Sequence, residues 1–208
     1  MFYTVRPPFL LKRFFASLTW QIPGSEKNLY LTFDDGPHPT ATPFILDQLN
    51  RVGAKASFFC LGKNVAAYPD LLERIIDEKH TVGNHTYNHL NGWKTSDKIY
   101  YEDIAKAARL IDSDLFRPPY GKITPFQIKL LQNKKAYVPS SIIMWSLLSG
   151  DFDEKLSPQK CYENILLNAN SGDIIVFHDS QKAWERLKYA LPRVLDHFSA
   201  EGFSFKPL

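Results

Sequence analysis

Residues 31–36 read Leu31-Thr32-Phe33-Asp34-Asp35-Gly36, an apolar run that is followed at once by two carboxylates and a glycine. An apolar run that ends in Asp-Gly is typical of a buried strand followed by a turn. Similar short apolar runs recur along the chain, and helix-length amphipathic segments separate them. This alternation decides the fold class.

The apolar runs are continuous rather than alternating, which favours strands that are buried on both faces of a parallel sheet. Seven such strands with crossover helices predict an α/β fold, a distorted (β/α) barrel, and an open doubly wound sheet is the alternative. We expect strands at residues 29–33, 56–60, 81–84, 115–117, 142–146, 173–177 and 203–206. We expect helices at residues 41–52, 65–79, 97–111, 124–134, 157–168 and 183–199.

The length of 208 residues indicates a single domain with a full hydrophobic core. We predict an N-terminal arm with a short helix at residues 1–25 and the barrel at residues 26–208. The beginning of the chain has no uninterrupted apolar stretch and no small-residue cleavage site, and no other segment is long enough to span a bilayer. We therefore expect a cytoplasmic protein without a membrane-spanning segment.

The composition is that of an ordinary globular protein, with 44% hydrophobic and 23% charged residues. The net charge of +3 is small and no run of Lys and Arg stands out, so neither a nucleic acid nor a membrane surface is expected as the main partner. Cys60 and Cys161 lack Cys-x-x-Cys spacing and are expected to be buried free thiols. The oligomeric state is left open.

A second polar motif, His85-Thr86-Tyr87-Asn88-His89, follows the third expected strand. A His-x-x-x-His pair alone is weak evidence for a metal site. Together with Asp35, however, the pair offers two imidazoles and a carboxylate, and Asp34 is left over beside them. Three protein ligands with an open position suit catalytic zinc, and a spare carboxylate can accept a proton from the bound water. The motifs therefore predict metal-assisted hydrolysis.

Further polar residues lie at the ends of other expected strands. Arg117 ends the fourth strand, Asp151 follows the fifth, and His178 and Asp179 follow the sixth. The carboxyl ends of the strands form the rim at which such barrels carry their active sites. We expect Asp179 to be a loop carboxylate and the others to join the metal ligands in one site.

These residues resemble the motifs of the polysaccharide deacetylases, which are metal-dependent carbohydrate esterases that include chitin and peptidoglycan deacetylases. Five motifs recur in that family in a fixed order, and this chain carries a version of each. They lie at residues 32–36, 85–89, 117–120, 151–152 and 176–178. The resemblance extends from about residue 29 to 206 and implies a distorted (β/α) barrel.

The resemblance also implies the metal ligands. Asp35, His85 and His89 would bind a divalent ion, usually Zn²⁺. Sites built from oxygen and nitrogen ligands can accept Co²⁺ or another divalent metal as well.

The remaining roles follow from the same resemblance. Asp34 would be the general base, and Arg117 would hold it ionised and oriented. His178 would be the general acid, with Asp151 fixing its tautomer and favouring its protonated form. The backbone N–H of Tyr120 would stabilise the oxyanion together with the metal.

The fourth motif departs from the family pattern. The family usually has an Asp three residues before Asp151 and a Trp directly after it, whereas this chain has Leu148 and Phe152. Both changes would alter the wall of the substrate pocket. We expect Phe152 to contact substrate and the pocket to accept acyl groups slightly larger than acetyl.

The function that these motifs predict is the removal of N-acetyl groups from an amino-sugar polymer or oligosaccharide. One alternative is deacylation of a small non-polymeric N-acyl compound. Another is a catalytically inactive barrel that binds carbohydrate, although the complete set of base, acid and three ligands favours an enzyme.

Overall fold

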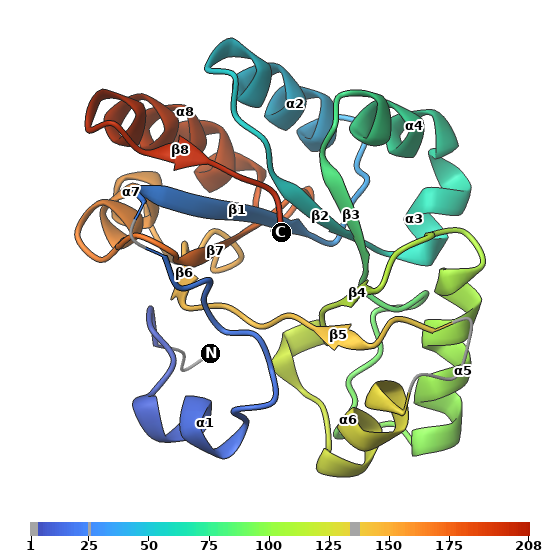
Figure 1. Cartoon of the computed structure of the whole chain (residues 1–208). Helices are drawn as coiled ribbons and strands as arrows, with labels where there is room; N and C mark the ends of the chain where they lie inside the picture. Colours follow the sequence, from blue (N-terminus) through green and yellow to red (C-terminus); the bar gives the residue numbers. More distant parts are fainter. Residues whose placement is uncertain (1–3, 25, 134–137) are drawn as a thin grey trace.

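The computed structural model describes residues 4–24, 26–133 and 138–208. A parallel sheet that curls into an open, distorted barrel forms its centre (Figure 1). In the middle of the sheet, β1 (Asn28–Asp34) lies between β2 (Ser57–Cys60) and β7 (Ile174–His178). These three strands are almost wholly buried, as continuous apolar runs require in a parallel sheet covered on both faces.

The other strands extend the sheet on both sides in the order β5-β4-β3-β2-β1-β7-β6, and β8 pairs with the start of β1. Every pair is parallel, and β1 to β5 follow one another in chain order on one side while β7 and β6 continue the circuit on the other. This order is that of a barrel and not of a doubly wound sheet, so it confirms the predicted barrel class. The strands are β3 (Thr81–Asn84), β4 (Leu115–Phe116), β5 (Ser141–Ile142), β6 (Leu147–Leu148) and β8 (Ser204–Phe205).

The expected strand at 142–146 is wrong. Only Ile142 of this segment lies in a strand, at the end of β5, and β6 begins after the segment at Leu147. Residues 143–146 connect these two strands, which lie at opposite edges of the sheet. The carbonyls of Ile143 and Met144 accept hydrogen bonds from the Arg117 side chain. An apolar run that crosses a barrel opening has the same sequence pattern as a buried strand, so the pattern could not separate the two.

Helices cover the outside of the sheet (Figure 1). The expected helix at 65–79 is two helices, because Pro69 occupies the first turn of the second one, where its missing N–H costs nothing. The last helix continues through Pro192, as expected. Residue 134 of the expected helix 124–134 lies outside the described residues. The helices are α2 (Ala41–Arg51), α3 (Gly62–Ala67), α4 (Pro69–Asp77), α5 (Asp97–Ala108), α6 (Pro125–Gln132), α7 (Pro158–Leu166) and α8 (Trp184–Ala200).

The N-terminal segment begins with the short helix α1 (Phe9–Phe14) and then joins the barrel. Leu18 and Trp20 are buried in a core cluster with Phe116 and Ile142. Residues 1–3 and 25 of the predicted arm lie outside the described part of the chain. Among the helices that the structure describes, none has the length and apolar character to cross a membrane.

The main core lies between the sheet and the helices α2, α7 and α8. Cys60 and Cys161 are both buried and unbonded, which confirms the prediction of free thiols.

Candidate active site

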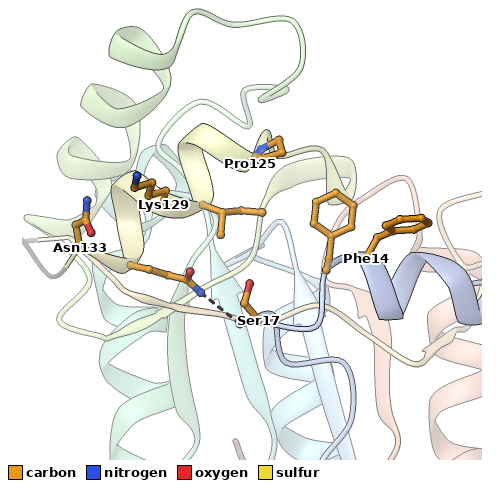
Figure 2. A pocket seen from close by; sticks show the side chains of 8 residues that line it. Phe14, Ser17, Pro125, Lys129 and Asn133 are labelled. Carbon is orange, nitrogen blue, oxygen red and sulfur yellow. Dashed lines mark hydrogen bonds between the residues drawn. The ribbon is translucent and has the colours of Figure 1, made fainter.

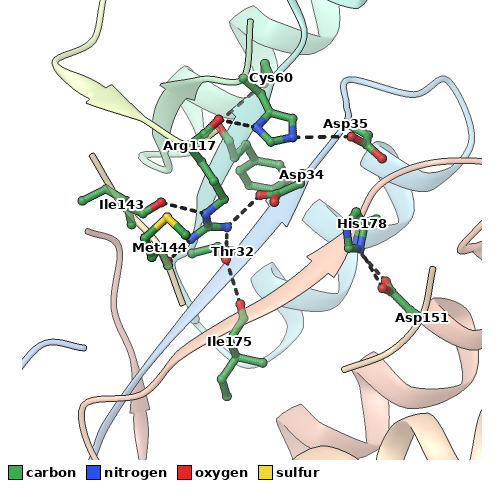
Figure 3. A network of polar contacts seen from close by, with 12 residues as sticks. Thr32, Asp34, Asp35, Cys60, Arg117, Ile143, Met144, Asp151, Ile175 and His178 are labelled. Atoms are coloured by element: carbon green, nitrogen blue, oxygen red, sulfur yellow. Dashed lines mark hydrogen bonds and ion pairs between the residues drawn. The ribbon is translucent and has the colours of Figure 1, made fainter. Parts of the chain in front are cut away.

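The polar residues singled out from the sequence gather at the carboxyl ends of the strands (Figure 3). Asp34 is the last residue of β1, and its partner in the register of the sheet is His178, the last residue of β7. Register partners project to the same face of a sheet. A carboxylate and an imidazole are therefore placed side by side by the strand pairing alone.

Asp35 faces the same site as Asp34, although consecutive residues of a regular strand point to opposite faces. The reason is its backbone, which has a φ of 82° and thus breaks the alternation directly after β1. His89 also has a positive φ, of 61°. Such values are uncommon for residues other than glycine and are held in place by surrounding contacts, often at functional sites.

Three ligand atoms converge here. The Oδ1 atom of Asp35 lies 3.1 Å from Nε2 of His89 and 3.7 Å from Nε2 of His85. All three residues offer ligand atoms within 4.8 Å of one another. The predicted ligand set is therefore brought together.

A hydrogen bond from Nδ1 of His85 leaves its other ring nitrogen, Nε2, free to bind a metal. Its Nδ1 lies 2.7 Å from the backbone carbonyl of Arg117, and a carbonyl can only accept, so Nδ1 carries the proton. The lone pair of Nε2 then points toward Asp35. Burial lowers the pKa of His85 to about 4, which keeps the imidazole neutral as metal ligation requires.

The donor set fits a divalent cation. Oδ1 of Asp35 is buried and accepts no hydrogen bond from the residues that the structure describes. Burial by itself would raise the pKa of Asp35, but its contact with His89 and the nearby imidazoles outweigh burial and lower the pKa. An anionic oxygen that faces an imidazole lone pair is repulsive unless a cation lies between them. One carboxylate and two imidazoles suit zinc and related metals.

Arg117 holds Asp34 from the interior of the barrel. Its Nη1 donates to Oδ1 of Asp34 at 2.7 Å and to Oγ1 of Thr32 at 2.7 Å. The guanidinium also lies over the ring of Phe59, 4.1 Å from its centroid. Both partners of the ion pair are buried, so this pair is shielded from solvent and from salt. One carboxyl oxygen of Asp34 is therefore fixed in place by Arg117.

His178 and Asp151 form a second pair on the other side of Asp34. The Nδ1 atom of His178 lies 2.8 Å from Oδ1 of Asp151, and the backbone N–H of His178 donates to Oδ2 at 2.7 Å. Burial alone would lower the pKa of His178, but the charge and hydrogen bond of Asp151 outweigh it and raise the pKa to about 9. His178 is therefore an imidazolium at neutral pH and can donate a proton from Nε2.

Known proteins share both the sequence and the fold of this chain. The family model described as polysaccharide deacetylase matches residues 21–137. A peptidoglycan-N-acetylglucosamine deacetylase of Bacillus cereus is 33% identical over 193 residues, which cover 90% of this chain and 89% of the relative. This chain belongs to the polysaccharide deacetylase family.

Other members of the family are similar over nearly the same length. A chitooligosaccharide deacetylase of Azorhizobium caulinodans is 30% identical over 207 residues, covering 90% of this chain and 96% of that protein. The crystal structure of the Bc1960 peptidoglycan N-acetylglucosamine deacetylase in complex with 4-naphthalen-1-yl-N-oxidanyl-benzamide has a TM-score of 0.86 and 31% identity, with 94% of each chain covered. The family, the barrel and the hydrolase class predicted from the sequence are thus confirmed.

The matched part of the family model ends before Asp151 and His178. The place of these two residues in the site therefore rests on their geometry in this polysaccharide deacetylase. The backbone carbonyl of Asp151 accepts a hydrogen bond from Nε of Arg186 at 2.6 Å. Arg186 was not foreseen from the sequence, because it lies on α8 in a stretch that reads only as an amphipathic helix.

Phe152 and Leu148 occupy different positions relative to the site. The ring of Phe152 contacts the ring of His178 edge-on, with centroids 5.3 Å apart. Leu148 is buried in β6 and is the register partner of Val176, two residues before His178. Its side chain thus shares a face of the sheet with His178. Phe152 thus contacts His178, the predicted acid, directly. Leu148 lies further from the carboxyl ends of the strands, at the level of Val176.

Tyr120 lies in a short 3-10 turn (Pro119–Gly121) and has a φ of 60°. Its hydroxyl is 3.1 Å from Nδ1 of His89, and the centroids of the two rings are 4.5 Å apart. The prediction for Tyr120 concerned its backbone N–H, so this side-chain contact with a metal ligand was missed. An isolated Tyr after Pro-Pro carries no signal for it.

Two further supporting residues, Asn64 and Asp103, were not predicted from the sequence. Asn64 donates from Nδ2 to the carbonyl of Asp35 at 2.7 Å. Asp103 on α5 accepts the backbone N–H groups of Tyr87 and Asn88, at 2.8 Å and 2.9 Å. These contacts fix the two loops that carry the proposed metal ligands. Asn64 lies on α3 and Asp103 on α5, so each loop is held by a neighbouring helix.

Asp179 is a buried residue with a packing role beside Asp35. A Cβ at Gly36 would lie 1.8 Å from Oδ2 of Asp179, so only glycine fits there. The hydroxyl of Thr42 donates to the same carboxyl oxygen at 2.6 Å. Burial raises the pKa of Asp179 to about 8 despite this hydrogen bond. The contacts agree with a carboxyl group that fixes the loop after β1.

Proposed function

We propose that this polysaccharide deacetylase removes N-acetyl groups from an amino-sugar polymer or oligosaccharide, with Asp34 as base and His178 as acid on opposite sides of a metal. One observation carries the proposal. Three ligand atoms lie within 4.8 Å of one another, beside a carboxylate paired with Arg117 and an imidazole paired with Asp151.

Asp35, His85 and His89 would hold the metal, and we propose zinc. A divalent ion at these ligands supplies a Lewis acid that makes a water acidic at neutral pH. The chain contributes by keeping the ligands in the required states. The Arg117 carbonyl fixes the tautomer of His85, and Tyr120 lies against His89.

The acid and the base have opposite tasks. Asp34 takes a proton from the attacking water, and Arg117 orients Asp34 for this step by donating to its Oδ1. His178 donates a proton to the leaving amine, because an unprotonated amine is a poor leaving group. With a pKa of about 9, His178 carries that proton at neutral pH. The backbone N–H of Tyr120 would donate a hydrogen bond to the oxyanion of the tetrahedral intermediate. A donor that is already in position stabilises this charge most effectively.

The substrate class follows from the relatives. One is named for peptidoglycan N-acetylglucosamine and another for chitooligosaccharides. Both kinds of glycan carry N-acetylated amino sugars, and we propose this unit for the present chain. Leu148 and Phe152 favour a second candidate, deacylation of a small N-acyl compound, because they make the region around His178 less polar than the family pattern.

The test is acetate release by the zinc-loaded protein. Oligomers of N-acetylglucosamine, peptidoglycan glycan fragments and free N-acetylglucosamine are supplied at equal concentrations of acetyl groups. Acetate from the oligomers or fragments, with loss of acetyl groups seen by mass spectrometry, is the expected result. Release from the monosaccharide alone would favour the small-compound reading. No release from any substrate by metal-loaded protein would favour an inactive barrel.

A further inference from the structure

The positive charge of the chain is concentrated in its first 25 residues. Three of its 25 Lys and Arg residues lie there, namely Arg6, Lys12 and Arg13, and none of its 22 Asp and Glu residues does. Residues 26–208 therefore hold 22 residues of each sign. Arg6 forms an ion pair with Asp173, so the positive charge that the segment presents is that of Lys12 and Arg13. The small overall value hides this local imbalance.

The same segment exposes large apolar side chains on one short helix. No residue of α1 is buried, and Phe9 and Phe14 are 74% and 82% exposed. Leu10 and Leu11 between them are also exposed. Single exposed apolar residues are ordinary, but four on a helix of six residues form a patch of the kind that marks an interaction site.

The chain directly after α1 is attached to the barrel, whereas no side chain of α1 itself is buried. Thr19 forms a bridge with Ile143, with backbone hydrogen bonds to Ile142 and Met144. The indole of Trp20 donates to the carbonyl of Phe15 at 2.9 Å. A helix of six residues is far too short to be stable on its own. A surface that covers its apolar side chains would supply the missing stabilisation.

A hollow of about 380 Å³ lies between the end of α1 and the helix α6 (Figure 2). Phe14 and Ile128 line it, and Lys129 adds a further cation at its edge. No ion pair involves Lys12, Arg13 or Lys129 among the residues that the structure describes. The metal-ligand residues lie elsewhere, at the carboxyl ends of the strands.

We propose that α1 is a membrane-surface anchor whose Phe9, Leu10, Leu11 and Phe14 enter the interface of a bilayer while Lys12 and Arg13 bind anionic lipid headgroups. Exposed Phe and Leu with neighbouring Lys and Arg are the composition of helices that lie in the membrane interface. A second copy of the chain fits less well, because a symmetric contact through α1 would bring the same cations of both copies together.

The experiment measures sedimentation of the full chain with vesicles of phosphatidylcholine alone and of phosphatidylcholine mixed with phosphatidylglycerol. We expect binding to the mixed vesicles that weakens as salt is raised, because juxtamembrane cations are attracted to anionic lipid over a Debye length. The variant Phe9→Ser/Leu10→Ser/Phe14→Ser keeps the charge and should lose most of this binding. Lys12→Glu/Arg13→Glu should weaken it by at least about tenfold.

Two matched variants serve as controls. Leu167→Ser removes an apolar side chain that is 71% exposed at the end of α7, and Lys98→Glu/Lys160→Glu makes the same change in net charge elsewhere. Leu167→Ser should bind vesicles like the unmodified chain, and Lys98→Glu/Lys160→Glu should bind more strongly than Lys12→Glu/Arg13→Glu. All variants should keep their thermal unfolding temperature, since the side chains are exposed.

Three outcomes would overturn the proposal. One is no sedimentation of the unmodified chain with the mixed vesicles. Another is equal binding by the triple serine variant. The third is a dimer in size-exclusion chromatography with light scattering that depends on Phe9 and Phe14, without affinity for vesicles, which would assign the patch to a second copy of the chain.

Discussion

At the scale of single residues, Asp34 and Asp35 show how two adjacent carboxylates obtain different tasks. Asp34 ends a strand and keeps the strand direction, so its carboxylate meets Arg117 at 2.7 Å. Asp35 has a φ of 82° and turns toward the two imidazoles. Identical side chains are thus separated by the backbone alone.

This separation predicts distinct losses for the two alanine variants. Asp34→Ala should lower kcat by at least about a hundredfold, the low end for a lost general base, and should keep its zinc. Asp35→Ala should lose zinc as well as activity, because one of three protein ligands is gone. Metal content after dialysis and acetate release on the same samples are the measurements. Loss of zinc from Asp34→Ala, or full zinc in Asp35→Ala, would contradict the assignment.

The pKa of His178 predicts how activity ends at high pH. The acid must be protonated, so activity is present below a pKa of about 9 and is lost as the pH rises through that value. Asp151→Asn removes the carboxylate charge that raises this pKa, and the alkaline limb of the pH–kcat profile should move to lower pH. Asp153→Asn, two residues away, is the control and should leave the limb in place. An unmoved limb in Asp151→Asn would show that another group sets it.

Phe152 predicts how strictly the acyl group is selected. Its ring packs on His178, where the family pattern has the larger indole. A hydrophobic pocket separates substrates that differ by one methylene by only about 10–200-fold, so the unmodified enzyme should also hydrolyse a propionyl group. Phe152→Trp should fill the space and lower kcat/KM for propionyl and butyryl more than for acetyl. Equal selectivity in both proteins, measured on one amino sugar, would exclude Phe152 from the acyl pocket.

At the scale of elements, the loop with His85 and His89 depends on the helix α5. Asp103 on that helix accepts backbone N–H groups of Tyr87 and Asn88, which lie between the two ligands. Asp103→Ala should leave these donors unsatisfied and weaken zinc affinity about 10–100-fold, the usual effect of removing support around metal ligands. Glu102→Ala on the exposed side of the same helix is the control. Competition with a zinc chelator measures both, and equal affinities would contradict the role of Asp103.

The elements also show what the sequence could predict. The runs at 29–33, 56–60 and 173–177 become β1, β2 and β7, because central strands of a parallel sheet are marked by continuous apolar residues. The order of the motifs also predicted that the proposed ligands, base and acid lie at one rim, and the structure brings these residues together there. Asn64, Asp103 and Arg186 could not be predicted, since each acts through one to three hydrogen bonds to a loop that only the folded structure brings beside it. The cytoplasmic location and the domain boundary at residue 25 stay predictions.

At the scale of the whole molecule, Arg117 joins the catalytic site to the closure of the barrel. The chain crosses from β5 at one edge of the sheet to β6 at the other, and the crossing carbonyls of Ile143 and Met144 bind the same guanidinium that holds Asp34. The buried Arg117 therefore connects the crossing segment to β1, in addition to the support of Asp34 that we propose for it.

This double role predicts that Arg117→Met unfolds more easily as well as losing activity. Removing one partner of a buried ion pair costs about 3–5 kcal/mol of the free energy of unfolding, because the other charge is left unpaired. Urea unfolding of the metal-free protein measures this loss without the effect of zinc.

Two further variants serve as controls. Asp34→Asn/Arg117→Met removes the unpaired charge of Asp34, so it should recover part of the stability and none of the activity. Arg74→Met breaks exposed ion pairs and should cost no more than about 1 kcal/mol. If Arg117→Met were as stable as Arg74→Met, the barrel would not depend on Arg117 for its closure.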